Sequence, residues 1–152
     1  MGDPVRAVLF DLGNTLVSYY RVSDFAPILR ESVDGLCEFL ADQKSVIADR
    51  DRAFQLALEL NTEDPSYRVR PLVGRLVQIF GECELEDSEL NEMCDIFLRP
   101  ILRLGTLDPN ALPTLAAKRE KGMRTAIVSN TPWGSPSERW RSEEHTSELQ
   151  SH

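Results

Sequence analysis

The chain has 152 residues and a mass of 17.2 kDa, which is typical of one domain, or of one domain with a small insertion, and too short for two full-sized domains. Its hydrophobic fraction of 41% is that of an ordinary globular protein, and its net charge of −8 disfavours binding to nucleic acid or to an anionic membrane surface. No apolar run approaches the ~20 residues of a membrane helix and the N-terminus shows no signal-peptide pattern, so we expect a cytoplasmic protein.

A buried strand and a polar turn begin the predicted fold. Residues Val5 to Phe10 (VRAVLF) are apolar and rich in β-branched side chains, and Asp11 to Asn14 (DLGN) supply the turn that ends the strand. A carboxylate placed directly after a buried strand is costly to ionise unless a cation or hydrogen-bond donors meet it. Asp11 can therefore ligate Mg²⁺ and attack phosphorus, or it can simply cap the turn, and the spacing alone favours neither reading.

Apolar residues then recur every three or four positions in four successive segments, which is the period of amphipathic helices that pack as a small bundle. Ser23 is the expected N-cap of the first helix, and Ile47 belongs to the second. Gly81 ends the third, and Pro100 kinks or ends the fourth, which starts near Asp87. The stripes are expected in the core rather than at a ligand: Phe25, Ile28, Leu29, Val33, Leu36, Phe39 and Leu40; Ile47, Phe54 and Leu58; Val69, Leu72, Val73, Leu76, Val77 and Phe80; Leu90, Met93, Cys94, Phe97 and Ile101.

Half of an α/β unit follows. A helix over about Asn110 to Lys121 ends at Gly122, and the strand Arg124 to Val128 (RTAIV) then runs into the polar loop Ser129-Asn130-Thr131. The hydroxyl, amide and N–H groups of that loop can hold a phosphoryl oxygen, although the same residues are ordinary turn formers. Parallel α/β sheets bind ligands beyond the carboxyl ends of their strands, where both polar loops of this chain lie.

The last segment, Arg141 to His152, is similar residue for residue to the translation of a common sequencing-library adapter. We therefore treat residues 141–152 as a non-native tail, with a natural polar tail as the alternative. The tail contains both histidines, His145 and His152, so the rest of the chain cannot form a histidine triad. The cysteines have irregular spacing and no nearby histidine, and we expect reduced thiols without a metal at Cys37, Cys83 and Cys94.

The two strand-end loops, in this order and separated by a helical block, resemble the haloacid dehalogenase-like superfamily of hydrolases, in the subclass with a helical cap inserted after the first motif. VLFDLGNTL is similar to the first motif of that family and TAIVSN to the second. The resemblance implies an α/β fold: the N-terminal part of a Rossmannoid parallel-sheet core with an inserted α-helical cap. Residues 1–17 and 106–140 would form the core, which is incomplete, and residues 18–105 the cap.

The resemblance also implies roles for individual residues. Asp11 would be the nucleophile, its carboxylate and the Gly13 backbone carbonyl would ligate Mg²⁺, and Ser129 with Asn130 would bind the transferring phosphoryl group. Thr15 would help to order the loop, and the cap would close over a small phosphorylated substrate.

Two departures from the family pattern matter. Gly13 stands where the family usually has a second aspartate that serves as general acid and base. The third-motif lysine and the fourth-motif acidic residues are expected beyond residue 140, so we expect a chain truncated after the second motif. Such a fragment would turn over little substrate, and its two strands would leave edges unpaired.

The most direct interpretation is a Mg²⁺-dependent phosphatase acting through an aspartyl-phosphate at Asp11 in the intact parent protein. A 2-haloacid dehalogenase that needs no metal is the enzymatic alternative, although such enzymes tend to carry an aromatic residue where Gly13 stands. A non-catalytic binding domain of the same fold is the third. Trp133 and Trp140 follow the second loop and are expected to pack at the surface rather than to line the site. No oligomeric state follows from the sequence.

Overall fold

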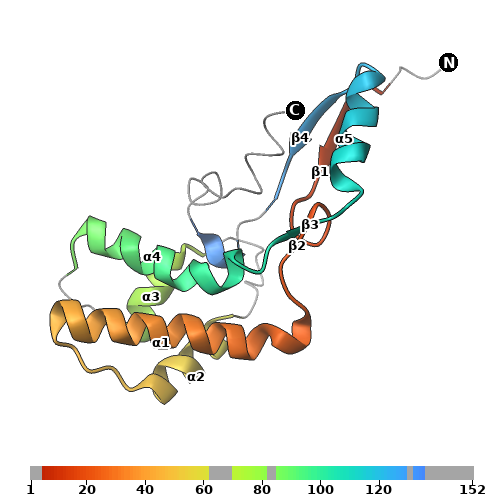
Figure 1. Ribbon diagram of the computed structural model, residues 1–152. Helices are drawn as coiled ribbons and strands as arrows, with labels where there is room; N and C mark the ends of the chain where they lie inside the picture. Colours follow the sequence, from red (N-terminus) through yellow and green to blue (C-terminus); the bar gives the residue numbers. More distant parts are fainter. Residues whose placement is uncertain (1–4, 62–69, 82–84, 130–131, 136–152) are drawn as a thin grey trace.

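A computed structural model describes residues 5–61, 70–81, 85–129 and 132–135 (Figure 1). Among the predicted features, Asn130, Cys83, Trp140 and the adapter-like segment lie outside the described residues. Two parts are evident in the ribbon: a layer of helices, and a strand-and-helix part that contains the start of the described chain (Figure 1).

The strand-and-helix part is built on a parallel pair of strands. β1 (Ala7–Phe10) pairs with β4 (Arg124–Ile127) in a register that sets Ala7 beside Arg124 and Phe10 beside Ile127. Helix α5 (Ala111–Glu120) lies alongside this pair (Figure 1), and Gly122, at a φ of 72°, turns the chain from the helix into β4. The chain is therefore a mixed α/β fold with a parallel sheet, as predicted, and is consistent with a Rossmannoid core. Both strands are slightly shorter than the sequence indicated.

A second, antiparallel pair of strands was not predicted. β2 (Val17–Ser18) pairs with β3 (Thr106–Leu107), and the Asp108 backbone N–H donates to the Leu16 carbonyl at 2.8 Å. Leu16 and Val17 are buried here against Ala111 of α5. The chain thus enters and leaves the helical layer at one place.

The helical layer consists of α1 (Phe25–Lys44), α2 (Arg50–Leu60), α3 (Leu72–Phe80) and α4 (Asp87–Leu102). Gly81 ends α3, as predicted, and has a φ of 86°. Only glycine adopts this backbone conformation freely. Pro100 does not end α4, which continues for two further residues to Leu102.

Two predictions about helix starts were wrong. Ser23 is not the N-cap of α1: it lies in a short 3₁₀ turn (Val22–Asp24), and its hydroxyl donates to the Asp24 carboxylate instead of accepting from a helix N–H. Ile47 is not in α2 and is 94% exposed. That helix begins only at Arg50, because the Asp49 carboxylate caps it by accepting from the backbone N–H groups of residues 51 and 52, both at 3.1 Å.

Most of the predicted apolar residues do form one core between the helices, whereas Ile47 is exposed and Val69 lies outside the described residues. Phe97 and Leu36 are fully buried, and the Ser32 hydroxyl donates across the α1–α4 contact to the Phe97 carbonyl at 2.8 Å. Gly35 lets the two helices approach closely, since a Cβ there would lie 3.2 Å from Ile96. The thiols of Cys37 and Cys94 are buried, and burial raises the pKa of Cys37. The four helices therefore share one packed core.

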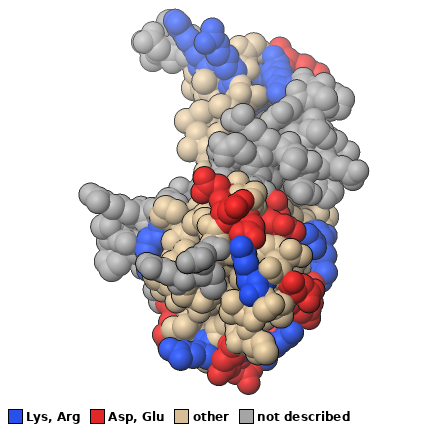
Figure 2. Space-filling view, turned by 90° about the vertical axis from the view of Figure 1, so that its left-hand side faces the viewer, with Lys and Arg blue, Asp and Glu red and all other residues tan. Residues whose placement is uncertain are grey.

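Ion pairs connect the outer faces of the helices. Arg30 of α1 pairs with Asp51 of α2 at 2.6 Å, and Arg103 forms two hydrogen bonds of 2.6 Å to Glu31. Acidic and basic side chains accordingly lie interspersed over the helical layer in the lower half of Figure 2. Within the described residues, no helix combines the length and the apolar character that crossing a membrane requires.

Candidate functional site at the sheet edge

The first two candidate residues follow neighbouring strands at the same edge of the sheet. Asp11 comes directly after β1 and Ser129 lies two residues beyond the end of β4. The ladder continues past the strands, because the Val128 backbone N–H donates to the Phe10 carbonyl at 2.8 Å. Asp11 and Ser129 therefore lie at the carboxyl edge of one parallel pair, and both are exposed to solvent.

Backbone hydrogen bonds fix the turn that carries Asp11. The Leu12 carbonyl accepts from the N–H groups of Leu16 at 2.9 Å and of Val17 at 3.0 Å, and the Asn14 N–H donates to the Val17 carbonyl at 2.8 Å. Asn14 has a φ of 57°, in the left-handed region that asparagine tolerates better than most residues. The turn is closed on itself, so the position of the Asp11 backbone does not depend on a ligand.

Thr15 reaches back to the carboxylate. Its Oγ1 donates to Asp11 Oδ2 at 3.3 Å, across a part of the chain that is open to water. This bond occupies one of the two carboxylate oxygens and leaves Oδ1 accessible. The arrangement can present an oriented carboxylate oxygen to a ligand at the sheet edge.

Gly13 lies two residues after Asp11, and its backbone carbonyl is the second candidate ligand. Of the described hydrogen bonds in the turn, none uses the Gly13 carbonyl as acceptor. Mg²⁺ in proteins is often held by one or two carboxylates together with waters and substrate phosphates, and the Asp11 carboxylate with the Gly13 carbonyl fits that donor set. Among the described residues there is no group of three or more His, Cys, Asp or Glu side chains that could hold a metal by itself.

Tyr19 lies beside this turn and was missed by sequence reasoning. A Cβ built on Gly13 would be 4.0 Å from Tyr19 Cε2, and one on Gly105 would be 3.4 Å from Tyr19 Cε1. The ring thus fills the space between the first turn and the chain leaving α4. Burial raises the pKa of Tyr19 to about 12, so the phenol stays neutral at physiological pH. No spacing in the sequence indicates this contact, because it depends on how β2 and β3 fold back on each other.

Trp133 does not pack at the surface as predicted. It lies in a 3₁₀ turn (Pro132–Gly134) four residues after Ser129, is only 7% exposed, and belongs to the core cluster of the helical layer. Its ring meets that of Phe97 edge-on, with centroids 5.0 Å apart. The loop after β4 is therefore connected directly to the helices.

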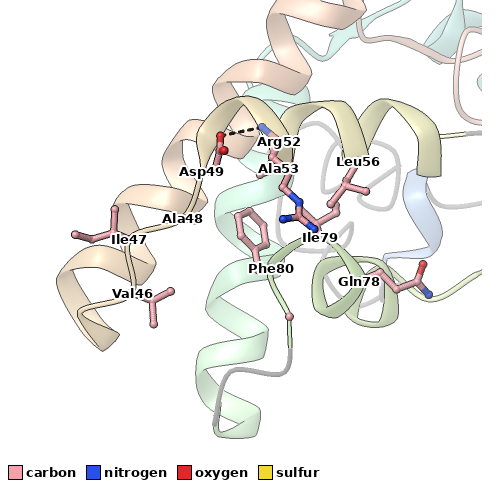
Figure 3. Close-up of a pocket in the computed structure, with 11 residues that line it drawn as sticks. Val46, Ile47, Ala48, Asp49, Arg52, Ala53, Leu56, Gln78, Ile79 and Phe80 are labelled. Atoms are coloured by element: carbon pink, nitrogen blue, oxygen red, sulfur yellow. Dashed lines mark hydrogen bonds between the residues drawn. The ribbon is translucent and has the colours of Figure 1, made fainter.

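Two pockets on the helical layer are separate from these residues. One, of about 390 Å³, lies between the start of α2 and the end of α3 and has Asp49, Arg52, Ile79 and Phe80 in its wall (Figure 3). The other, of about 490 Å³, lies between α1 and α4 and includes Arg99. Neither is lined by a predicted site residue, so the sheet edge remains the candidate site.

The chain is similar in structure to a solved protein but matches no known sequence family. No protein-family model and no curated protein sequence matches the chain. Among solved structures, it is similar to the crystal structure of a predicted phosphoglycolate phosphatase from Haemophilus somnus 129PT, with 20% sequence identity and a TM-score of 0.38. The match covers 88% of this chain and 53% of that one, so the chain spans about half the length of that protein.

Proposed function

We propose that the intact protein is a haloacid dehalogenase-like hydrolase, a Mg²⁺-dependent phosphatase of a small phosphorylated metabolite. The observation that carries this proposal is the pairing of two loops at one sheet edge: Asp11 after β1, and Ser129 after β4, joined by the hydrogen bond from Val128 to Phe10 at 2.8 Å. A carboxylate and a hydroxyl that follow neighbouring strands at one sheet edge can act on one phosphoryl group.

Asp11 is the proposed nucleophile. Its carboxylate oxygen attacks phosphorus, the ester oxygen leaves with the electron pair of the broken P–O bond, and an aspartyl-phosphate forms. Water then hydrolyses this acyl phosphate and regenerates the carboxylate. The hydrogen bond from Thr15 at 3.3 Å favours one orientation of the carboxylate, and Ser129 with Asn130 is proposed to hold the phosphoryl oxygens.

Bound Mg²⁺ would neutralise part of the charge on the phosphoryl oxygens. The Asp11 carboxylate and the Gly13 carbonyl are the residues of this chain that would hold it. Both lie in or next to the closed turn described above, which backbone hydrogen bonds hold without a metal.

Gly13 has a consequence for the leaving group. Glycine has no titratable side chain, so this position cannot protonate the departing ester oxygen. The Tyr19 phenol, with a pKa of about 12, is too weak an acid to replace an aspartic acid efficiently. We therefore expect faster turnover of esters with an acidic leaving group, such as p-nitrophenyl phosphate, than of alkyl phosphates.

The helical layer is the proposed cap. Residues 18–105 would close over the substrate bound at the sheet edge, and residues 1–17 with 106–140 would form the core. Support comes from the β2–β3 pair, through which the chain enters and leaves the layer at one place next to the first turn.

The test is the change Asp11→Asn in the intact protein, whose extent is defined by reading the source gene across the codon for Trp140. We expect hydrolysis of p-nitrophenyl phosphate with Mg²⁺ to fall by about a thousandfold or more, because the amide is a poor nucleophile. Asp42→Asn, at an exposed position of α1, is the matched control and should leave turnover unchanged. Full activity of the Asp11 variant would refute the mechanism.

A 2-haloacid dehalogenase is the second candidate, and one observation favours it. Although Gly13 is not aromatic, the ring of Tyr19 lies against it, at 4.0 Å from the position of a Cβ. Halide release from 2-haloacids that survives chelation of divalent metals would select this activity. A protein that binds phosphate and hydrolyses neither class of substrate would instead be the non-catalytic binding domain.

A further inference from the structure

The loop after β4 is held against the helical layer by Trp133. Trp133 is the fourth residue after Ser129, and a chain of that length spans at most about 14 Å between the two Cα atoms. The indole is buried among the helices. The residues that surround it therefore lie close enough to the candidate phosphoryl site for a small metabolite to contact both. Figure 1 shows the 3₁₀ turn of Trp133 between the strand-and-helix part and the helices.

Arg75 of α3 lies on the face of this indole. Its guanidinium carbon is 4.9 Å from the centroid of the Trp133 ring, within the range of a cation–π contact. The Nε of Arg75 is shielded from solvent and has no hydrogen-bond partner. A buried guanidinium N–H without an acceptor is unfavourable, and a bound acceptor would remove that cost.

The surroundings of Arg75 differ from those of three other arginines in or next to the helices. Arg30, Arg50 and Arg103 each lie within 4 Å of a carboxylate. Among the described residues, no ion pair links Arg75 to a carboxylate, and the positive charge of Arg70 acts on it. Burial, and then this like charge, lower the pKa of Arg75. The site is half-buried and positively charged, and Trp133 connects it to the loop after β4.

We propose that Arg75, with Arg70 beside it, binds a second anionic group of the substrate, a carboxylate or phosphate at the end remote from the phosphoryl group that reacts. This inference rests on the proposed function for the reaction and on the Trp133 contact for its position. Arginine suits the role because its planar fork can stack on an indole and still donate two hydrogen bonds in its own plane to one oxyanion. The preferred substrate is then a phosphate ester with a second negative charge.

A binding titration tests the site without turnover. In the Trp140→Phe variant, Trp133 is the remaining tryptophan of the 152-residue sequence, and its fluorescence reports movement of the guanidinium that lies on it. At constant ionic strength, malonate and inorganic phosphate should each give a saturable change, whereas malonamide, which is uncharged, should give none. The tighter-binding of the two anions identifies the group that the site prefers.

Arg75→Gln in the same background should raise the dissociation constant for malonate about tenfold or more, the effect of losing charge-assisted hydrogen bonds. Arg52→Gln, at an exposed position of α2, is the control and should change nothing. If Arg75→Gln does not fold, as judged by circular dichroism, Arg75→Lys is tested instead. Lysine keeps the positive charge but cannot donate two coplanar hydrogen bonds to one oxyanion, so this variant should bind malonate several-fold more weakly. Unchanged affinity in the folded variant, or no saturable response in the parent, would overturn the proposal.

Turnover then separates this inference from the proposed function. Arg75→Gln should raise KM about tenfold for 3-phosphoglycerate but leave KM for glycerol 3-phosphate, which lacks the carboxylate, within about twofold. Equal changes for both substrates would refute a specific role for Arg75. If no phosphate ester is hydrolysed, the proposed function fails, and the malonate titration still decides whether the anion site exists.

Discussion

The helical layer and the β1–β4 pair bury very different shares of their apolar side chains. In the helices, Phe97 and Leu36 are fully buried around one continuous core. In the parallel pair, Leu9 is 65% exposed and Ile127 44% exposed. Stability and the candidate site therefore lie in different parts of the molecule. Helix packing supplies most of the stability of the described chain, and the candidate site residues follow the strand ends.

The largest effect on stability should come from a substitution in the helical core. Phe97→Ala should lower the free energy of unfolding by about 3–5 kcal/mol, because it removes a buried ring and leaves a cavity. Leu9→Ala, on the sheet, should change it by less than about 0.5 kcal/mol, as is usual for an exposed position. Urea unfolding followed by far-ultraviolet circular dichroism compares the two. Similar losses in both variants would show that the sheet is as well packed as the helices.

A smaller effect should separate two helix starts within the layer. Asp49→Ala should lower the free energy of unfolding by about 1 kcal/mol, because the Asp49 carboxylate accepts two backbone N–H groups at the start of α2. Asp24 occupies the same position before α1 without a side-chain cap, so Asp24→Ala is the matched control and should cost less. Thermal unfolding of the two variants measures the difference. A larger loss from Asp24→Ala would contradict this account of the caps.

The smallest effect should be a change in how stability depends on pH. The hydrogen bond from Lys44, at 2.7 Å, and then the backbone N–H of Glu86 lower the pKa of Glu89 below its ordinary value of 4.5. A lowered pKa in the folded state stabilises the protein above the unfolded value, and this contribution is lost as pH falls below about 4.5. Glu89→Gln keeps the capping box at the start of α4 and should flatten the fall in urea midpoint between pH 6 and pH 3. Glu92→Gln, at an exposed position, is the control and should leave the pH dependence of the urea midpoint unchanged. An equal flattening in the Glu92 variant would show that the effect does not come from Glu89.

The fold was predictable from the sequence where a local pattern determines it. The recurrence of apolar residues every three or four positions located the four helices of the helical layer. Gly81 and Gly122 marked the ends of α3 and α5. The pattern failed where a single side chain decides a boundary: hydrophobicity placed Ile47 in a helix, but the Asp49 cap starts α2 after it. β2 and β3 were missed because strands of two residues have no period to detect.

The candidate site was predictable only in its order along the chain. Asp11 and Ser129 could be placed at strand ends from the sequence, and the parallel register then brings them to one edge. Tyr19, Arg75 and Trp133 could not be found, because their contacts join residues far apart in the chain and leave no spacing signal. The roles of Asp11, Gly13, Thr15 and Ser129 stay predictions until the Asp11 variant is assayed.

The burial of Trp133 also limits how evolution or design can rearrange this molecule. The β2–β3 pair brings the entry and exit of the helical layer together, a geometry that normally allows an insert to be exchanged as a module. Here a residue from beyond β4 completes the core of that insert. Grafting the helices onto another scaffold would leave Phe97 without its indole neighbour, and deleting them would expose the tryptophan to water. The insert and the loop after β4 are therefore transferable only as a pair.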